Sequence, residues 1–334
     1  MQKRVLIISD GIPGHVNQSR GIVTLLKKKY KIFTSEVELE SKIYFLRSLI
    51  QIIARTLCKN LNTYSAGIII NLYKKIQLED YDLIVAAGGK TAPIVAAIKH
   101  NSNIPAVQLG SPRGSIHASL FNALVTVEKY FNHHANVVTD ITPNLYSPEI
   151  CSLAAKNKNL SDHILFLIGG QGIGYSYSAW EWESLILNIL SINEKTRTPI
   201  SIVTSRRTDP LVEKKLETQL SEINTRYSAW FHKGDKNFNL DALFGSAKKI
   251  FVTEDSAMMI SESISSGKPV STLYPSKIKS PARYRKHIQK YEDLKYIIRQ
   301  SIESFSVDFD SDAQNRIEAH HRDLLKIILA KINW

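Results

Sequence analysis

Short apolar runs alternate with amphipathic segments along the chain, and polar or glycine-rich residues follow most of these runs. In the first half, the runs lie at 5–9, 82–86, 104–109, 123–127 and 136–139. In the second half, they lie at 163–168, 200–204, 229–232, 250–252 and from 270 onward. Runs of this length between helical segments are typical of strands buried in a parallel sheet. The pattern therefore predicts an α/β protein.

The chain has 334 residues, which suggests two domains that are each large enough for their own core. The polar stretch 156–162 is the candidate linker between them. We therefore expect an N-terminal domain over 1–155 and a C-terminal domain over 163–310. The last segment, 311–334, is amphipathic, and we expect it to form a helix that packs back toward the N-terminal domain.

The net charge of +12 indicates an anionic partner, such as nucleic acid, acidic lipid or a phosphorylated substrate. Nucleic acid would explain the charge but not the glycine-rich loops at strand ends, so we do not predict it. Cys58 and Cys151 are too few for a disulfide framework or a zinc site, and they indicate a reducing compartment. No apolar run reaches the ~20 residues of a spanning helix. We expect a cytoplasmic protein that uses no metal.

Residues 41–78 combine apolar and basic side chains and contain neither Asp nor Glu. Arg47, Gln51, Arg55 and Lys59 recur every four residues, so they share one stripe of a helix. A basic amphipathic helix with aromatic residues is typical of attachment to an anionic membrane surface. The alternative is a pair of surface helices with a solvated cationic face.

The loop after the first strand carries the candidate catalytic residues. Asp10 follows the strand directly, and His15 comes next in a turn rich in glycine and proline. A histidine titrates near neutral pH without tuning, whereas Asp10 would need a raised pKa to act as a base. Gly14, Asn17 and Gln18 are candidates for acceptor or anion binding. In the alternative interpretation, Asp10 caps the loop and His15 is solvated.

Two further loops of the first half carry cations at strand ends. Lys90 and Thr91 follow a glycine pair and open a helix, where an anion or a sugar is favoured. Arg113 follows the strand at 104–109 and is suited to a phosphate or a carboxylate. Neither loop has P-loop spacing, and no loop has the dinucleotide fingerprint.

The second half carries the candidate donor-binding residues in three loops. The first loop is flexible enough to cradle a phosphate and begins with Gly169, Gly170 and Gln171. The second would clamp a diphosphate and contains Ser205, Arg206 and Arg207. A solvated turn would tolerate the residues of the second loop equally well.

The third loop connects a short apolar strand to a helix start. Glu254, Asp255 and Ser256 supply the polar residues at that start, where free N–H groups favour an anion. Glu262 lies eight residues after Glu254. This layout is expected where nucleotide phosphates meet a helix and a carboxylate binds ribose hydroxyls. The alternative is an ordinary capped helix.

Taken in order, these motifs resemble those of the mitochondrial fission ELM-one-like family, which has a glycosyltransferase-B (GT-B) type of architecture. The matching segments are 10–11, 14–15, 17–18, 89–93, 111–113, 168–170, 204–208, 252–256 and 262–270. Ser111 stands where the family has an aspartate, and the region of His133 and His134 departs from the family pattern. The resemblance covers nearly the whole chain.

The resemblance implies two Rossmann-like domains facing across a cleft, with nucleotide-sugar binding mainly by the second domain. It further implies that the acceptor and the base belong to the first domain, and that no metal or other cofactor is bound. We expect a glycosyltransferase of envelope or capsule polysaccharide synthesis, attached to the inner face of the membrane, with a lipid-linked or saccharide acceptor. Two alternatives stay open: a non-catalytic, membrane-associated adaptor of the fission-factor type, and a UDP-sugar epimerase.

Overall fold

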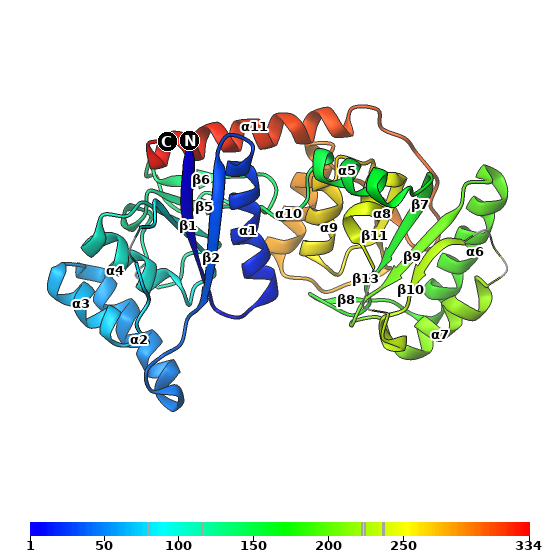
Figure 1. Cartoon of the computed structure of the whole chain (residues 1–334). Coiled ribbons are helices and arrows are strands. Elements are labelled where there is room, and N and C mark those ends of the chain that lie inside the picture. Colours follow the sequence, from blue (N-terminus) through cyan, green and yellow to red (C-terminus); the bar gives the residue numbers. More distant parts are fainter. Residues whose placement is uncertain (79, 115, 222, 224, 236–237) are drawn as a thin grey trace. The chain divides into compact units, whose positions relative to one another are not determined.

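The computed structural model describes residues 1–78, 80–114, 116–221, 223, 225–235 and 238–334. The chain divides into two compact units (Figure 1). The first unit comprises Met1–Leu145 and His320–Trp334, and the second comprises Tyr146–Ala319. Each unit is built around one parallel six-stranded sheet.

The first sheet has the strand order β2-β1-β3-β4-β5-β6, and every neighbouring pair is parallel. Its strands are β1 (Gln2–Ser9), β2 (Lys31–Glu38), β3 (Leu83–Ala87), β4 (Ala106–Leu109), β5 (Ala123–Thr126) and β6 (Asn136–Val138). Its α-helices are α1 (Pro13–Lys27), α2 (Arg47–Leu57), α3 (Thr63–Asn71) and α4 (Ala92–Ser102). Single-turn 3₁₀ helices lie at η1 (Tyr44–Leu46), η2 (Cys58–Asn60) and η3 (Ala118–Leu120).

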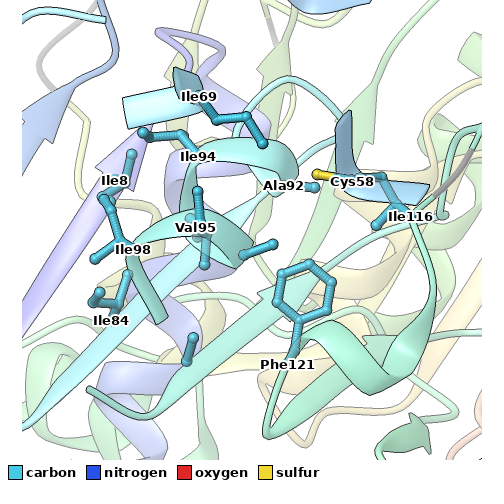
Figure 2. Close-up of a cluster of buried hydrophobic side chains, with 14 of the residues drawn as sticks. Ile8, Cys58, Ile69, Ile84, Ala92, Ile94, Val95, Ile98, Ile116 and Phe121 are labelled. Atoms are coloured by element: carbon cyan, nitrogen blue, oxygen red, sulfur yellow. The ribbon is translucent and has the colours of Figure 1, made fainter. Parts of the chain in front are cut away.

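Successive side chains of a strand point to opposite faces, so each face of this sheet has its own core. Ile8 and Ile84 belong to the core that contains residues of α2, α3 and α4 (Figure 2). Ile7 and Val85 belong to the other core, which contains residues of α1 and of the C-terminal helix α11 (Ala313–Ile332). The sheet is thus covered on both faces, as a parallel sheet requires.

The part of the C-terminal helix from His320 onward completes the first unit. The apolar side chains that it buries in the core of Ile7 and Val85 are Leu324, Ile328, Leu329 and Ile332. Near the chain end, the Nδ2 of Asn122 donates a hydrogen bond to the carbonyl oxygen of Lys331 at 3.3 Å. The expectation that this helix packs on the first half of the chain is confirmed.

The second sheet has the order β10-β9-β7-β11-β12-β14 and is also parallel throughout. Its strands are β7 (His163–Ile168), β9 (Ile200–Thr204), β10 (Thr225–Ala229), β11 (Ala247–Thr253), β12 (Val270–Tyr274) and β14 (Ile298–Ser301). β8 (Tyr175–Ser176) and β13 (Lys277–Ile278) form a separate antiparallel pair. The helices are α5 (Pro148–Lys158), α6 (Ala179–Thr196), α7 (Pro210–Gln219), α8 (Leu240–Ser246), α9 (Ala257–Ser265) and α10 (Ala282–Asp293), with η4 at Phe231–Lys233.

The boundary between the units falls before α5, whereas the sequence placed it at 156–162, a stretch that includes the last turn of this helix. The reason is the close packing of α5 on α8. A Cβ atom added at Gly245 would lie 1.9 Å from the carbonyl oxygen of Cys151, so only glycine permits this approach. The helix therefore belongs to the second unit, although its last turn lies in the polar stretch 156–162.

None of the described helices is both long and apolar enough to cross a bilayer.

Candidate functional sites

In both units, the candidate residues lie near the point in the sheet where the strand order reverses. From β1 the chain places β2 on one side and β3 on the other, and from β7 it places β9 on one side and β11 on the other. Ligands of open α/β sheets bind at such a switch point, beyond the carboxyl ends of the strands. The first unit therefore has one candidate site at the β1/β3 ends, and the second unit has another at the β7/β11 ends.

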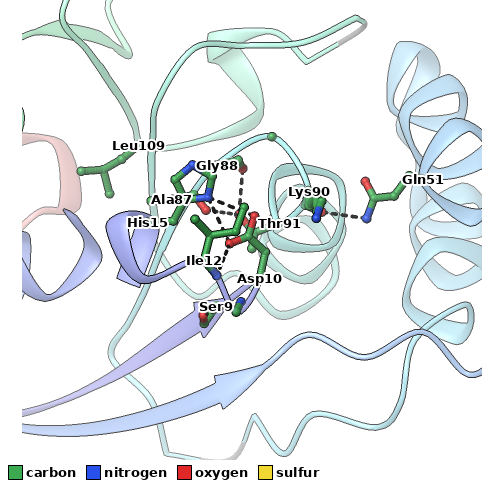
Figure 3. Close-up of polar contacts among 12 residues, drawn as sticks. Ser9, Asp10, Ile12, His15, Gln51, Ala87, Gly88, Lys90, Thr91 and Leu109 are labelled. Carbon is green, nitrogen blue, oxygen red and sulfur yellow. Dashed lines mark hydrogen bonds and ion pairs between the residues drawn. The ribbon is translucent and has the colours of Figure 1, made fainter. Parts of the chain in front are cut away.

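At the β1/β3 switch point, Asp10 and His15 form a pair (Figure 3). The Nδ1 of His15 lies 3.0 Å from both carboxylate oxygens of Asp10. The Asp10 side chain is only 2% exposed, whereas that of His15 is 31% exposed. Gly88 lies against the imidazole ring, because a Cβ atom there would be 2.3 Å from Nδ1. The ring is thus held in place while part of it stays accessible.

The charge state of Asp10 distinguishes the roles of the two residues. Burial raises the pKa of Asp10, but the hydrogen bond and charge of His15, the amide of Ile12 and the charge of Lys90 together outweigh it and lower the pKa. Asp10 is therefore ionised at neutral pH, and it is not the base with a raised pKa that the sequence allowed. It orients His15 and leaves Nε2 as the ring nitrogen available to a substrate.

The polar residues of α1 lie beside this pair. Gly14 is in the first turn of the helix, and Asn17 and Gln18 follow in the next. The amides of Asn17 and Gln18 are partly exposed, and no described residue hydrogen-bonds them. Gln18 also lines a small cavity of about 160 Å³ beyond the ends of β4 and β5. These two amides are available to a ligand.

The candidates in the β3 and β4 loops divide into accessible cations and a buried hydroxyl. Lys90 is exposed, and the exposed Arg113 packs over Gly89, where a Cβ atom would lie 3.0 Å from its Cδ. In contrast, the Thr91 hydroxyl is fully buried and donates to the carbonyl oxygens of Ala87 and Gly88 at 3.1 and 3.0 Å. The Thr91 hydroxyl therefore fixes the turn. The sequence suggested that it would bind an anion or a sugar, and its burial prevents this.

At the β7/β11 switch point, the glycines allow the protein's own groups to approach closely. A Cβ atom at Gly169 would lie 2.2 Å from Asp255, and one at Gly170 would lie 2.0 Å from the carbonyl oxygen of Arg207. The amide of Gly169 donates to the Thr253 hydroxyl at 2.7 Å. Internal packing thus explains why these two positions are glycine, whereas the sequence suggested a flexible phosphate cradle.

Glu254 is fully buried, and protein groups occupy both of its carboxylate oxygens. Arg299 donates to them from Nε and Nη2 at 2.8 and 3.0 Å. The hydroxyls of Tyr175 and Thr272 donate at 3.0 and 2.7 Å. The carboxylate of Glu254 therefore cannot bind a donor, and the sequence expectation for this residue is wrong.

Asp255 is likewise fully buried and internally paired. Its Oδ2 accepts from the Nε of Arg207 at 2.7 Å, and its Oδ1 accepts from the Thr253 hydroxyl at 2.7 Å. Burial raises the pKa of Asp255, and the charge of Arg207 opposes this rise. Its side chain orients Arg207 and has no oxygen exposed to a donor, so this expectation also needs correction.

Ser256 and Glu262 lie on the helix that these acidic residues precede. The Ser256 hydroxyl caps α9 by accepting from the amide of Met259 at 3.3 Å. Glu262 is partly exposed, and no described residue hydrogen-bonds its carboxylate. Burial raises the pKa of Glu262 to about 7. An unpaired, partly desolvated carboxylate of this kind is typical of a binding site.

A cavity of about 490 Å³ lies within the second unit and is lined by several of the candidate residues. Gly170, Gln171, Arg206 and Arg207 contribute to its wall. Arg206 is exposed and pairs with no described residue, whereas Asp255 holds the Nε edge of Arg207. Ser205 stabilises the turn, because its hydroxyl accepts from the Arg207 amide at 3.2 Å. The cavity is large enough for a small-molecule ligand.

Sequence reasoning missed several residues of this region. Trp182 and His232 line the cavity, yet they lie in a helix and in a 3₁₀ turn that no polar motif marked. Arg299 was missed because it is far from Glu254 along the chain and lies in a strand without an apolar run. The sequence offered one signal of the buried partners of Glu254, the pair Tyr175 and Tyr177 after the glycine loop. The Tyr175 hydroxyl donates to the Glu254 side chain, and the Tyr177 hydroxyl accepts from its backbone amide.

Solved structures of known proteins are similar to this chain over nearly its whole length. UDP-GlcNAc 2-epimerase from Methanocaldococcus jannaschii is 12% identical, with a TM-score of 0.54, and the alignment covers 99% of this chain and 100% of that one. ADP-heptose lipopolysaccharide heptosyltransferase II from E. coli is 13% identical, with 99% and 98% covered and a TM-score of 0.41. UGT71G1 from Medicago truncatula, complexed with UDP-glucose, is 10% identical, with 99% and 93% covered and a TM-score of 0.44.

The first of these likenesses, together with the two parallel sheets, shows the fold: two Rossmann-like domains of GT-B type. A search of the curated proteins gave no match. The family model described as Mitochondrial fission ELM1 matches residues 13–312, which is most of the chain. The accessible cations Lys90, Arg113 and Arg206 lie within the matched range. The chain therefore belongs to the mitochondrial fission ELM1 family.

Proposed function

We propose that the protein is a glycosyltransferase that moves a sugar from a nucleotide-sugar donor to a lipid-linked or saccharide acceptor. The observation that carries this proposal is the pairing of Asp10 with His15 at a sheet switch point. An ionised carboxylate behind Nδ1 and an accessible Nε2 are what a base for an acceptor hydroxyl needs. The proposed site of action is the inner membrane face, in envelope or capsule polysaccharide synthesis.

In the proposed reaction, Nε2 of His15 takes the proton of an acceptor hydroxyl. The hydroxyl oxygen forms a bond to the anomeric carbon of the donor sugar, and the bond from that carbon to the diphosphate oxygen breaks. The nucleoside diphosphate leaves with the electron pair of the broken bond. This order of bond changes inverts the configuration of the anomeric carbon, and it requires a base, which is His15.

The second unit is proposed to bind the donor. Arg206 and Arg207 would meet the diphosphate from the cavity wall, and the start of α9 at Ser256 would add its N–H groups. Glu262 would accept hydrogen bonds from ribose hydroxyls. Charge stabilisation of the leaving diphosphate by these fixed groups would supply much of the catalysis, without a bound metal.

Donor binding is tested first, by thermal shift of the purified protein against UDP, GDP, CMP, ADP and their sugars. One nucleotide class should stabilise the protein, and Arg206→Ala should remove the stabilisation. At a ligand concentration about 100 times Kd, the stabilisation amounts to about 2.7 kcal/mol. The absence of a shift with every nucleotide would contradict the proposal.

His15→Gln then tests the chemistry. We expect donor binding to persist while transfer to an acceptor falls by about 10² to 10⁴, which is typical for loss of a general base. The matched control is His100→Gln, which removes an exposed imidazole far along the chain on α4. Conversion of the donor sugar without any acceptor would instead indicate an epimerase.

A second candidate function is a non-catalytic, membrane-associated adaptor. It is favoured by the internal use of Glu254 and Asp255, whose carboxylates hold the fold and not a donor. An adaptor should keep its partner binding after Arg206→Ala and His15→Gln, and it should show no response to nucleotides. The thermal-shift screen therefore separates the two functions.

A further inference from the structure

The surface of η1 and α2 exposes large apolar side chains. Phe45 is 84% exposed and Ile52 is 60% exposed, and Tyr44 and Leu49 are at least half exposed. The opposite side of α2 buries Ile50 and Ala54 in the first unit's core. The helix is therefore anchored by one face and presents a second apolar face to the surroundings, which is typical of an interaction surface.

The charged residues of the segment that carries this apolar face all have one sign. Residues 41–78 contain no Asp or Glu, and the exposed Arg47 and Lys59 lie on or next to α2. Arg55 and Lys59 are four residues apart, so they lie on the same side of the helical segment. A partner for this surface must therefore combine apolar groups with negative charge.

A cavity of about 630 Å³ adjoins the same helix. It is lined by Ile52, Arg55, Thr56, Lys59 and Gly114. Among the described residues, the buried Nε of Arg55 has no hydrogen-bond partner, and its Nη2 makes only a long contact of 3.4 Å to the Gly89 carbonyl oxygen. No acidic side chain is among the described lining residues, so the two cations are not neutralised there.

The helix that lines this cavity is connected to the turn after β3, against which His15 of the proposed catalytic pair lies. The Nε2 of Gln51 donates to the carbonyl oxygen of Lys90 at 3.1 Å, so α2 is tied to the turn after β3 (Figure 3). Within that turn, Gly88 lies against the His15 ring and Gly89 accepts from Arg55. A group bound between Arg55 and Lys59 therefore lies close to the proposed acceptor site.

We propose that the cavity between α2 and Gly114 binds the doubly charged phosphate headgroup of a lipid, whose chains lie along the exposed apolar face of η1 and α2. Two cations match the two charges, and the cavity is open beside Gly114, where an added Cβ atom would meet nothing within 4 Å. The inference deepens the proposed function, on which its catalytic meaning rests, by identifying the acceptor as a lipid phosphate or diphosphate.

The test uses vesicle binding of the full chain without nucleotide. One vesicle contains phosphatidylcholine with phosphatidic acid, which has a doubly charged headgroup. The other contains phosphatidylcholine with enough phosphatidylglycerol, which is singly charged, to match the surface potential. We expect the wild type to prefer phosphatidic acid by about tenfold, the value of one good hydrogen bond to a charged group.

Two double variants that remove equal charge separate the headgroup site from general attraction. Arg55→Gln with Lys59→Gln should abolish the preference for phosphatidic acid. Arg47→Gln with Lys75→Gln removes exposed charges that do not line the cavity, and it should weaken binding to both vesicles equally, by about fivefold per charge. Lys59→Gln alone changes only an exposed side chain, so it tests the site even where loss of Arg55 impairs folding.

Equal binding to the two vesicles would overturn the inference, because attachment would then be purely electrostatic. Retention of the preference in Arg55→Gln with Lys59→Gln would also overturn it. The inference would also be overturned if inorganic phosphate competed for the site as strongly as phosphatidic acid vesicles do, because the site would then bind free phosphate. Donor binding is measured in a separate experiment. Failure of the lipid headgroup site would therefore leave the proposed transferase function intact, and failure of donor binding would leave the headgroup site intact.

Discussion

Glu254 and Arg299 form a bidentate ion pair inside the second unit, and the Tyr175 and Thr272 hydroxyls complete the shell of the carboxylate. Such a pair costs desolvation when it forms, but removal of one partner leaves the other charge buried and unmatched. Its role is to fix the relative positions of β11, β12 and β14. Any effect of these residues on donor binding would therefore be indirect.

We expect Arg299→Met to lower the free energy of unfolding by about 3–5 kcal/mol, because Glu254 would lose its charged partner. Glu254→Gln with Arg299→Met should cost less than the sum of the single changes, since neither variant group then carries a charge. Urea unfolding measures both. Arg206→Ala is the control and should stay within about 0.5 kcal/mol of the wild type. Equal stability of Arg299→Met and the wild type would contradict the structural role.

Glu262 gives the second unit a pH dependence of its own. Burial raises its pKa to about 7 in the folded protein, above the ordinary value of 4.5. The folded state therefore holds this proton more tightly than the unfolded state does, and stability falls as pH rises from about 4.5 through 7.

Glu262→Gln should remove that loss, so its stability relative to the wild type should rise between pH 5 and pH 8, by an amount on the order of 2 kcal/mol. Thermal unfolding at a series of pH values measures the difference. Glu183→Gln, on the exposed side of α6 in an ion pair with Lys215, is the control and should not alter the pH dependence in this range. A constant difference between Glu262→Gln and the wild type would refute the assignment.

How far the sequence reveals a site depends on where the interacting residues lie along the chain. Asp10 and His15 are neighbours in one loop, and their spacing alone made them a candidate pair. Glu254 looked equally functional, because its loop has the same form, but the partner that changes its role lies 45 residues away. A buried ion pair between distant segments leaves no local pattern, so the sequence could not separate a ligand-binding carboxylate from a structural one.

At the scale of secondary-structure elements, the packing of α5 on α8 determines where the first unit ends. The helices approach so closely that Gly245 faces the backbone of Cys151. A different glycine, Gly67 in α3, faces open space, because a Cβ atom there would meet nothing within 4 Å. The same added methyl group would therefore clash at Gly245 and meet open space at Gly67.

Gly245→Ala should destabilise the second unit by about 1–3 kcal/mol, because the methyl group has no room beside the Cys151 carbonyl. Gly67→Ala should stabilise the protein by about 0.5–1 kcal/mol through the higher helix propensity of alanine. Denaturant unfolding of the two variants makes the comparison. A stabilising Gly245→Ala would show that α5 is not packed on α8 as described.

The strands that sequence reasoning missed or displaced lie at sheet edges. β2 and β14 carry mostly exposed or half-exposed residues, so they have no apolar run to mark them. β10 was expected at 229–232 but ends at Ala229, again at an edge. Central strands such as β3 and β7 are buried on both faces and were found at nearly the expected positions. Edge strands need only one neighbour, so their side chains are less constrained.

At the scale of the whole molecule, two segments distant in the sequence complete one unit. Leu324, Ile328, Leu329 and Ile332 of α11 pack with side chains of β1 and β3. The termini also meet, since the Nζ of Lys3 lies 4.9 Å from the centre of the Trp334 ring. The last segment of the chain is therefore part of the first core.

Ile328→Ala should lower the stability of the first unit by about 2–5 kcal/mol, because its side chain is fully buried. Ile327→Ala makes the same chemical change at a position that is 41% exposed, and it should cost less than 1 kcal/mol. Hydrogen exchange of β1 and β3 follows the first unit, and that of β7 and β11 follows the second. If Ile328→Ala reduced protection only in the second unit, the assignment of α11 to the first unit would be wrong.

The return of α11 to the first unit has a consequence for biosynthesis. A ribosome makes β1 and β3 early, but α11, which helps α1 to cover one face of their sheet, emerges after all the other elements described above. Until then, Val5, Ile7, Leu83 and Val85 lack part of their cover, and such exposed apolar surface promotes aggregation. The second unit, although encoded later, contains all of its strands before α11 is finished. The half of the protein that is translated first is thus the half that matures last.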